Sequence, residues 1–437
     1  MTFEKLQLCA SSMRSAVLLH FSKMHDRILE DEFMKGAAMM DEAYPVRHFC
    51  CRDISTKKMK SYYRDETGFF SSAQPLIGPV RGETGVDGLR LDFNDGLRLE
   101  VPKGKFHVRI SDADSEMVFF DDDVSGVRLQ SMEKFYVRWQ IDVHRGGALV
   151  FSHTFDPTGQ QVFFVDCSTL LGDSLVVIPY LRAFREQYGA RVSCCLPPYL
   201  GDFARRMVPE IEFRDTWPED CYATFYFGAS IDTPALAPED GRFMPMEELG
   251  HLIFGVPWPR QLPVFPAGER QIQEPYVCIG VQASHPAKGW LYPDGWEIVT
   301  AALREAGYRV LCIDKERENS ADGFSAQIPA GAEDFTGEHP IEERAELLAH
   351  ADFFIGLSSG LSWLAYFVGC PVVMICGKII FEIPARASRA VRKGFSNARR
   401  QLRRAWCSTP FADCSRIGNG WHDFFGCACL TRGRFVF

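Results

Sequence analysis

The sequence lacks long hydrophobic runs. No stretch of about 18 apolar residues occurs in it, and a helix that crosses a membrane needs about that many. The residues after Met1 also lack the charge and apolar pattern of a secretory signal peptide. We therefore expect no membrane span and a cytoplasmic protein.

An excess of basic charge is also missing. The chain has 48 Lys and Arg against 57 Asp and Glu, a formal net charge of −9. Because nucleic acid is a polyanion, a protein that binds it usually presents a basic surface. The composition therefore gives no reason to expect nucleic acid as a partner.

Disulfides are not expected, although the chain has 15 cysteines. A free Cys in an apolar strand packs as a small hydrophobe, and disulfides are rare in cytoplasmic proteins. Several cysteines lie in such strand-like contexts: Cys194, Cys195, Cys278, Cys312 and Cys370. We expect most of the cysteines to be free and buried.

The first half of the chain predicts a small β domain. An apolar fraction of 46% in 437 residues is typical of a globular protein with more than one domain. We expect residues 1–85 to be an N-terminal extension, in which residues 1–66 show some helical periodicity and are either an accessory helical segment or a poorly ordered stretch. Residues 86–158 contain short alternating runs, and Asn94-Asp95-Gly96 between residues 89–93 and 97–101 indicates a hairpin, because Asp-Gly favours a tight turn. We expect an antiparallel barrel or sandwich there.

From residue 159 the pattern changes to strands that alternate with helices. This pattern is typical of doubly wound parallel sheets. It predicts one Rossmann-like domain at residues 159–256, a Pro-rich linker at 257–275 and a second Rossmann-like domain at 276–377. The expected fold class is therefore α/β.

One unit of the second Rossmann-like domain could bind an anion. Residues 353–355 and 372–375 read as strands, with a small polar turn at 356–360 and a helix at 361–368. Free N–H groups at a helix start favour a diphosphate. The candidate binding residues are Ser358, Ser359, Gly360, Leu361 and Ser362. The alternative is an ordinary N-capped turn.

Three other polar segments follow predicted strands. Residues 169–174, with Thr169 and Gly172, place Asp173 just before a helix predicted at 175–188. A carboxylate there can take a proton from a hydroxyl, or it can simply cap the helix.

Lys288 and Asp314 follow two strands of the second domain. Lys288, in a small-residue loop with Gln282 and Ser284, supplies a cation for a diphosphate. Asp314 follows the strand predicted at 308–313, where an acid can accept hydrogen bonds from ribose. The alternatives are a solvated loop lysine and a surface acid.

Several of these segments together resemble the bacterial heptosyltransferases, most closely the autotransporter O-heptosyltransferases. The resemblance covers about residues 86–377. The segments that carry it are residues 91–96, 169–174, 282–284 with Lys288, 310–316 and 354–363. It implies a GT-B glycosyltransferase with two Rossmann-like domains, preceded here by the β domain.

The resemblance also implies an activity and a site. The family transfers heptose from ADP-heptose to serine hydroxyls of autotransporter adhesin passengers, in the cytoplasm. By this resemblance Asp173 is the catalytic base, Lys288 binds the donor phosphates, and residues 358–362 form the diphosphate turn. No metal takes part in the chemistry. The family forms large homo-oligomeric rings, and each subunit holds a structural iron through four cysteines.

Residues 378–437 depart from that family. They hold 12 Lys and Arg and 3 Asp and Glu, so the charge changes from −18 in residues 1–377 to +9 in the tail. Lys378-Ile379-Ile380 and an Arg-rich run follow the last predicted strand, where relatives have a different segment. We expect a frame-shifted or otherwise aberrant tail. The alternative is a basic arm for an acidic partner.

The tail contains the candidates for an iron site: Cys407, Cys414, Cys427 and Cys429. The gaps between them are 6, 12 and 1 residues, and the tail has no Cys-x-x-Cys. A four-thiolate site needs ligands that converge tetrahedrally, usually from two short turns. The spacing matches poorly, so we do not expect structural iron in this chain.

Two alternative functions stay open. One is a lipopolysaccharide core heptosyltransferase, although such enzymes lack the β domain that residues 86–158 predict. The other is a non-catalytic remnant of the family with a defective C-terminus.

Overall fold

The structure is a computed structural model, and it describes most of the chain between residues 79 and 375. The described residues are 45–49, 79–168, 170–227, 236–239, 244–284, 288–290, 292–321, 324–375, 427–431 and 434–436. Contacts divide them into two compact units. Unit 1 contains the described residues up to Ser168, Val176–Pro198 and Pro209–Arg260. Unit 2 contains Leu170–Leu175, Tyr199–Val208 and the described residues from Gln261.

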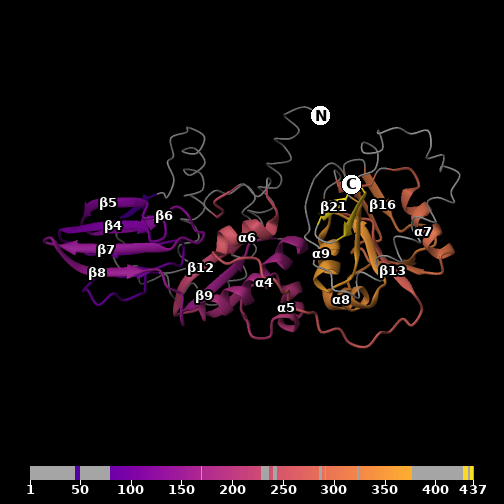
Figure 1. The fold of residues 1–437 in the computed structure, drawn as a ribbon, viewed down its shortest axis with the longest axis horizontal. Coiled ribbons are helices and arrows are strands. Elements are labelled where there is room, and N and C mark those ends of the chain that lie inside the picture. Colours follow the sequence, from indigo (N-terminus) through magenta and orange to yellow (C-terminus); the bar gives the residue numbers. More distant parts are fainter. Residues whose placement is uncertain are drawn as a thin grey trace, which may run out of the picture. The chain divides into compact units, whose positions relative to one another are not determined.

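Unit 1 begins with two small β-sheets. One has the order β5-β4-β7-β8 and is antiparallel throughout, as the purple strands of Figure 1 show. Its strands are β4 (Phe106–Asp112), β5 (Val118–Val124), β7 (Trp139–Arg145) and β8 (Ala148–Thr154). Val108, Ile110, Ile141 and Val143 are buried at every second position, the period that a half-buried strand requires. The predicted antiparallel β region is confirmed.

The second small sheet contains the predicted hairpin. Its order is β1-β6-β3-β2, with β1 (Val46–Phe49), β2 (Arg90–Asp92), β3 (Arg98–Val101) and β6 (Val127–Ser131). The connection is longer than a tight turn, because β2 ends at Asp92 and β3 begins at Arg98. Gly96 has φ +65°, and a Cβ there would lie 2.2 Å from the Ser131 Oγ. Only glycine fits this position without strain.

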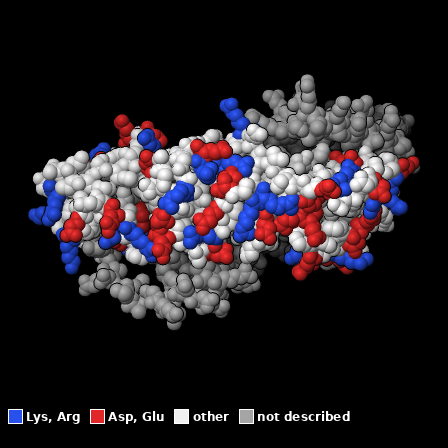
Figure 2. Space-filling view, turned by 90° about the horizontal axis from the view of Figure 1, so that it is seen from below, with Lys and Arg blue, Asp and Glu red and all other residues white. Residues whose placement is uncertain are grey.

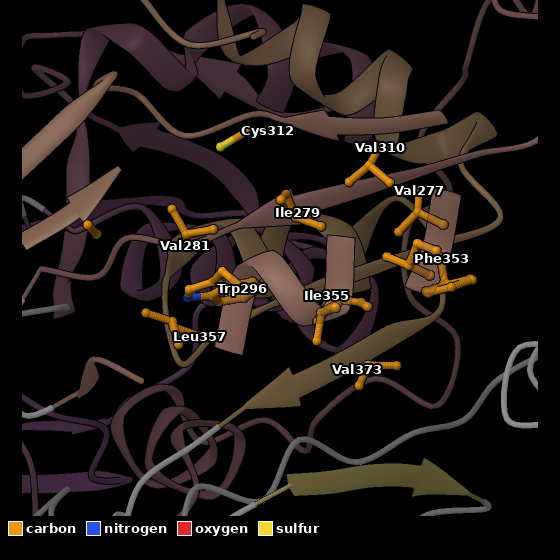
Figure 3. Packing of buried hydrophobic residues seen from close by; sticks show 13 residues of the cluster. Val277, Ile279, Val281, Trp296, Val310, Cys312, Phe353, Ile355, Leu357 and Val373 are labelled. Atoms are coloured by element: carbon orange, nitrogen blue, oxygen red, sulfur yellow. The ribbon is translucent and has the colours of Figure 1, made fainter. Parts of the chain in front are cut away.

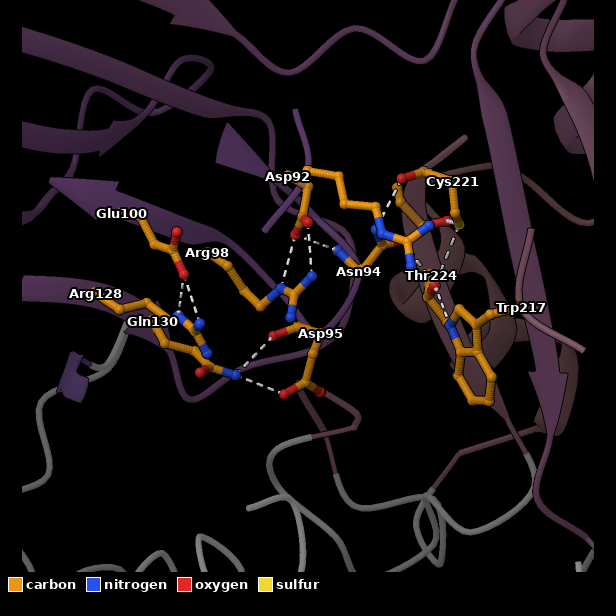
Figure 4. A network of polar contacts seen from close by, with 12 residues as sticks. Asp92, Asn94, Asp95, Arg98, Glu100, Arg128, Gln130, Trp217, Cys221 and Thr224 are labelled. Atoms are coloured by element: carbon orange, nitrogen blue, oxygen red, sulfur yellow. Dashed lines mark hydrogen bonds and ion pairs between the residues drawn. The ribbon is translucent and has the colours of Figure 1, made fainter. Parts of the chain in front are cut away.

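Buried charges hold the hairpin connection in place (Figure 4). Arg98 donates to both Asp92 carboxylate oxygens at 2.7 and 2.6 Å. Lys134 Nζ lies 3.1 Å from Asp95 Oδ2, which also accepts a hydrogen bond from Gln130 at 2.6 Å. Burial lowers the pKa of Lys134, and Asp95 opposes that shift. These buried groups are all hydrogen-bonded, as stable burial requires.

The same connection joins the hairpin to the first parallel sheet of unit 1. Asn94 Nδ2 donates to the Cys221 carbonyl at 2.7 Å, and Thr224 Oγ1 donates to Asn94 Oδ1 at 3.2 Å. Phe93 forms a parallel bridge with Ala223. The small β region and the parallel sheet of unit 1 are therefore joined by backbone and side-chain hydrogen bonds.

The parallel sheet of unit 1 has the order β11-β10-β9-β12. Its strands are β9 (Gln161–Asp166), β10 (Arg191–Cys195), β11 (Glu212–Phe213) and β12 (Cys221–Phe227). Two helices pack with it, α4 (Leu171–Tyr188) and α6 (Met246–Phe254). Phe164 of β9 contacts Phe184 and Phe254 of these helices, with ring centroids 5.2 and 5.1 Å apart. The sheet is buried, as a parallel sheet with helices on it requires.

Unit 2 contains a larger sheet with the order β17-β14-β13-β18-β19-β20-β21. The strands from β17 to β19 are parallel, and β20 and β21 are antiparallel. Their bounds are β13 (Tyr276–Gly280), β14 (Arg309–Cys312), β17 (Glu333–Asp334), β18 (Phe353–Leu357), β19 (Val372–Ile375), β20 (Cys427–Thr431) and β21 (Arg434–Val436). Figure 3 shows side chains such as Val277, Ile355 and Trp296 meeting in its core.

The other elements of unit 2 are mostly helices. They are α5 (Gly201–Met207), α7 (Gly295–Glu305), α8 (Ile341–His350) and α9 (Gly360–Phe367), with η1 (Pro198–Leu200) partly in the unit and a hairpin of β15 (Glu318–Ala321) and β16 (Phe324–Gln327). The alternation of strands and helices in the second Rossmann-like domain also predicts helices at residues 295–306 and 341–349, and α7 and α8 occupy nearly these ranges. The α/β fold class with two parallel sheets is confirmed.

Several other expectations can be compared with these elements. The helix predicted at 175–188 begins four residues earlier, at Leu171. Seven cysteines in the described part of the chain are free and buried, as expected: Cys167, Cys194, Cys195, Cys221, Cys278, Cys312 and Cys370. Among the described residues, no helix is both long and apolar enough to cross a membrane. The predicted domain boundaries stay predictions.

The tail is described only in part. Strands β20 and β21 extend the sheet of unit 2 beyond β19, and Val373 lies opposite Cys429. Residues 376–426, with Cys407 and Cys414, lie outside the described residues, as do the side chains of Cys427 and Cys429. The expectation of an aberrant tail therefore stays a prediction, and so does that of an N-terminal extension, which falls mostly on residues that are not described.

Candidate active site

The predicted diphosphate turn connects β18 to α9. Ser359 is the N-cap residue with φ −139°, and α9 begins at Gly360. The first N–H groups of a helix have no partner within it and carry partial positive charge. Ser358, Gly360 and Leu361 are half-buried beside them. The turn therefore has the geometry that an anion requires.

The two other serines of this turn differ from each other. Ser362 is buried and its hydroxyl donates to the Leu357 carbonyl at 2.6 Å, so it stabilises the turn rather than presenting a free donor. The Ser359 Oγ is also shielded from solvent, but it has no hydrogen-bond partner in the described part of the chain. A buried hydroxyl without a partner is costly, and an oxygen of a bound anion would satisfy it.

Lys288 lies in the loop that follows β13. It is half-buried, and this burial lowers the pKa of its ammonium group, while the charge of Asp173 opposes that shift. Gln282 is buried and donates through Nε2 to the Glu316 carbonyl at 2.7 Å. Ser284 is exposed. Among the loop residues predicted to bind the donor, Lys288 is therefore the one that carries a charge and is partly buried.

Asp173 lies in the first turn of α4 and is half-buried. The helix begins before it, so Asp173 does not occupy the N-cap position that one alternative assigned to it. Its charge raises the pKa of Lys288, although burial lowers that pKa more. Asp173 and Lys288 belong to the same compact unit, and Thr169 lies outside the described residues.

Asp314 is in the expected place after β14 but in different surroundings. It is 2% exposed. Its carboxylate accepts hydrogen bonds from the backbone N–H of Val281 at 2.7 Å and of Gln282 at 3.3 Å. Burial raises the pKa of this carboxyl to about 6. These contacts fix the start of the Lys288 loop, and the ribose-binding role of Asp314 stays a prediction.

Arg344 is a structural residue that the sequence patterns did not indicate. It lies in α8, and its guanidinium donates to the carbonyls of Ile313, Asp314, Gly337 and His339. These bonds fix the segment after β14. An Arg in an amphipathic helix looks like a solvated residue in the sequence, so only the fold shows that it is 4% exposed.

Glycines bring the first turns of α4 and α9 together within unit 2. A Cβ at Gly172 would lie 2.6 Å from Trp363 Cδ1, and one at Gly360 would lie 2.6 Å from Leu171 Cβ. Both distances are shorter than real contacts allow. Gly172, predicted to bind substrate, thus has a packing role in the structure, and its binding role stays a prediction.

The described residues do not test the candidate iron site. Among them, no group of three or more His, Cys, Asp or Glu residues could hold a metal ion. The side chains of the four candidate cysteines are all outside the described part of the chain. Neither the presence nor the absence of iron follows from this.

The surface charges are mixed. Figure 2 shows acidic and basic side chains interspersed on one face of the described residues. Several of them form ion pairs, for example Arg309 with Glu333 at 2.7 Å. Exposed pairs of this kind contribute little to stability.

Two family models match this chain. The model of the glycosyltransferase TibC N-terminal domain matches residues 85–147, and that of glycosyltransferase family 9 (heptosyltransferase) matches residues 258–379. The first match falls on the antiparallel β region. The second contains Lys288, Asp314 and the α9 turn.

Curated relatives cover most of the chain. The autotransporter heptosyltransferase BAHTCr of Citrobacter rodentium is 40% identical over 330 residues, 72% of this chain and 78% of the relative. The inactive autotransporter heptosyltransferase BimC of Burkholderia thailandensis is 33% identical, over 67% of this chain and 71% of the relative.

A solved structure shows the same fold. The crystal structure of the iron-containing dodecameric glycosyltransferase TibC from enterotoxigenic Escherichia coli H10407 matches with a TM-score of 0.64 and 37% identity, over 68% of this chain and 80% of TibC. The structure of TibC in complex with ADP-D-β-D-heptose matches equally, with a TM-score of 0.64 and 36% identity over 69% and 81% of the two chains. The fold of this chain is therefore of the GT-B type, and the chain belongs to the autotransporter heptosyltransferase family.

Proposed function

We propose that this protein transfers heptose from ADP-heptose to serine hydroxyls of an autotransporter passenger protein. Its family supports the reaction class, and TibC, 39% identical in sequence, has been solved with ADP-D-β-D-heptose bound. The observation that carries the proposal for this chain is the grouping of Asp173, Lys288 and the α9 turn in unit 2.

Asp173 is the general base in this proposal. Its carboxylate takes the proton of the serine hydroxyl as the serine oxygen forms a bond to the anomeric carbon of heptose. The bond between that carbon and the diphosphate oxygen breaks, and ADP leaves with the electron pair. A base placed at a sheet edge and partly shielded from water suits this proton transfer.

Lys288 and the α9 turn stabilise the leaving group. The ammonium of Lys288 pairs with the negative charge that develops on the diphosphate. The N–H groups at the start of α9 and the Ser359 hydroxyl, which has no partner among the described residues, donate hydrogen bonds to its oxygens. Because Lys288 is partly desolvated before the donor binds, its pairing with a phosphate is stronger than that of a lysine in water.

The experiment that tests this proposal compares acceptors. The purified protein is incubated with ADP-heptose and either a passenger fragment or a lipid A precursor, and heptose addition is measured by mass spectrometry. We expect addition of one or more heptoses to passenger serines and none to the lipid. Transfer to the lipid alone would favour a lipopolysaccharide core enzyme, against which the matched TibC N-terminal domain already argues.

An inactive protein is the second candidate. The relative BimC is described as inactive, and the tail of this chain departs from the family pattern. If ADP is released from ADP-heptose with neither acceptor, the result would support an inactive protein and contradict the proposal.

Assembly and cell compartment are also proposed by analogy. TibC is dodecameric and iron-containing, which supports a large homo-oligomer for this chain. We propose that it acts in the cytoplasm, where the acceptor is present before export. The expected oligomer can be measured by light scattering of the purified protein.

A further inference from the structure

Trp363 lies directly on the backbone that precedes the catalytic candidate. An ideal Cβ at Gly172 would be 2.6 Å from Trp363 Cδ1 and 3.2 Å from Trp363 Nε1. Gly172 is buried, and the indole is half-buried above it. At this position only a hydrogen atom leaves room for the indole, so residue 172 and residue 363 are sterically matched.

A second contact of the same kind lies beside the first. A Cβ at Gly360, the first residue of α9, would be 2.6 Å from Leu171 Cβ and 3.0 Å from Leu171 Cγ. Each helix thus contributes one glycine that the other helix covers with a side chain. The first turn of α4 and the whole of α9 belong to the same compact unit.

The indole is also supported by its own helix. Its ring is stacked on Phe367 at 6.2 Å and 26°, and it meets Tyr366 edge-on at 6.2 Å. Ser362, next to it, is fixed by its hydrogen bond to the Leu357 carbonyl. The Trp363 side chain is therefore a rigid surface against which the first turn of α4 rests.

We infer that Trp363 is a positioning residue that sets the place of the Asp173 carboxylate relative to Lys288 and the α9 turn. This inference rests on the proposed function. Gly172 is adjacent to Asp173 in the sequence, so a shift of its backbone moves the carboxylate directly. The Gly172–Trp363 contact acts on a catalytic step rather than only on stability.

The first test is Trp363→Leu, which removes the surface under Gly172. A misplacement of about 1 Å near a reacting group can lower the rate about 10²-fold. We expect kcat to fall by about that factor, with little change in KM for ADP-heptose. The matched control is Tyr308→Leu, which removes a partly buried aromatic ring that packs on Phe353 elsewhere in unit 2, and we expect kcat within a few-fold of wild type.

The second test is a double-mutant cycle. Gly172→Ala alone brings a methyl group against the indole and should lower kcat. In Gly172→Ala/Trp363→Leu the smaller side chain makes room, so we expect the double variant to be no slower than Gly172→Ala. Defects that multiply would show two independent sites and overturn the inference. Trp363→Phe, a smaller change, tests the same point if Trp363→Leu does not fold.

Asp173→Asn separates this inference from the proposed function. If Trp363 acts through the carboxylate, Trp363→Leu should cause no further loss in the Asp173→Asn background. A wild-type protein that transfers heptose while Trp363→Leu keeps its kcat would overturn the inference alone. A wild-type protein that transfers nothing would overturn both.

Discussion

Individual polar residues of this site work in apolar surroundings, and Lys288 is the clearest case. Its pKa is lowered by burial, so it loses its proton at a lower pH than an ordinary lysine. The charged form binds the donor phosphates. Affinity for ADP is therefore present at low and neutral pH and is lost as the pH rises through the lowered pKa, before the usual lysine range is reached.

Substitution of Lys288 should weaken ADP binding more than it lowers the free energy of unfolding. A hydrogen bond to a charged group contributes about 1.5–3 kcal/mol, which corresponds to roughly a 10- to 150-fold rise in the Kd of Lys288→Ala. Lys288→Arg stays charged, so its affinity for ADP should vary less with pH than that of wild type. Calorimetry between pH 7 and pH 10 measures both effects. An affinity for ADP that Lys288→Ala leaves unchanged would contradict the role of this lysine.

Glu247 is a buried carboxylate without a described role in the reaction. It is 4% exposed, and neither carboxylate oxygen has a hydrogen-bond partner in the described part of the chain. Burial raises its pKa to about 7, above the ordinary value of 4.5. The protonated form is favoured in the folded state, so its contribution to stability is present below about pH 4.5 and is lost as the pH rises through about 7.

Glu247→Gln should therefore stabilise the protein at pH 8. The difference between the two pKa values corresponds to an upper limit of about 3 kcal/mol in the free energy of unfolding. Glu248→Gln, at the exposed neighbouring position, is the control and should change stability little. Thermal unfolding at pH 5 and pH 8 checks this. Equal effects of Glu247→Gln at both pH values would contradict the assigned pKa.

At the scale of elements, the hairpin β2–β3 depends on a buried ion pair. Arg98 and Asp92 are 0% and 2% exposed. Arg98→Ala leaves Asp92 charged and unpaired in the interior, which typically costs about 3–5 kcal/mol. Arg109→Ala breaks an exposed pair with Asp121 at 2.7 Å and should cost about 1 kcal/mol or less. Urea unfolding measures the loss of stability in both variants. Similar losses in the two would show that the buried network is not essential.

Most elements were predictable because their patterns depend on local rules. The alternation of residues 106–110 and the apolar runs at 276–281 and 353–355 follow from the period of two and from burial on both faces. The helix α6 was missed, although the acidic residues of its first turn and Gly255 at its end are typical signals of helix boundaries. The strands β11 and β17 are only two residues long, too short to leave a pattern.

The site was predictable in part, for a similar reason. Lys288 and the α9 turn follow strands β13 and β18 of one parallel sheet, and parallel strands place their ends at one edge. Asp173 follows β9 of the other parallel sheet. The structural role of Asp314 depends on Val281, which is 33 residues away in the sequence. That of Ser362 depends on the Leu357 carbonyl, five residues away across the turn. The contact between Gly172 and Trp363 likewise depends on tertiary packing, so no local sequence pattern predicts it.

At the scale of the whole molecule, the tail (residues 378–437) is the part in which this chain departs from the family pattern. TibC contains iron, while the cysteine spacing of residues 407–429 fits a four-thiolate site poorly. We expect less than stoichiometric iron in the purified protein, measured by elemental analysis after extensive dialysis. About one tightly bound iron per chain would show that the tail forms the family's site despite its spacing.

The transfer reaction itself also belongs to the whole molecule, since it needs both a donor and an acceptor. The most direct measurement compares wild type with Asp173→Asn, using ADP-heptose and a passenger fragment and counting heptoses by mass spectrometry. General-base help contributes about 10²–10⁴-fold, so we predict a loss of that size in kcat with ADP affinity nearly unchanged. An Asp173→Asn protein that transfers heptose within a few-fold of the wild-type rate would contradict the account.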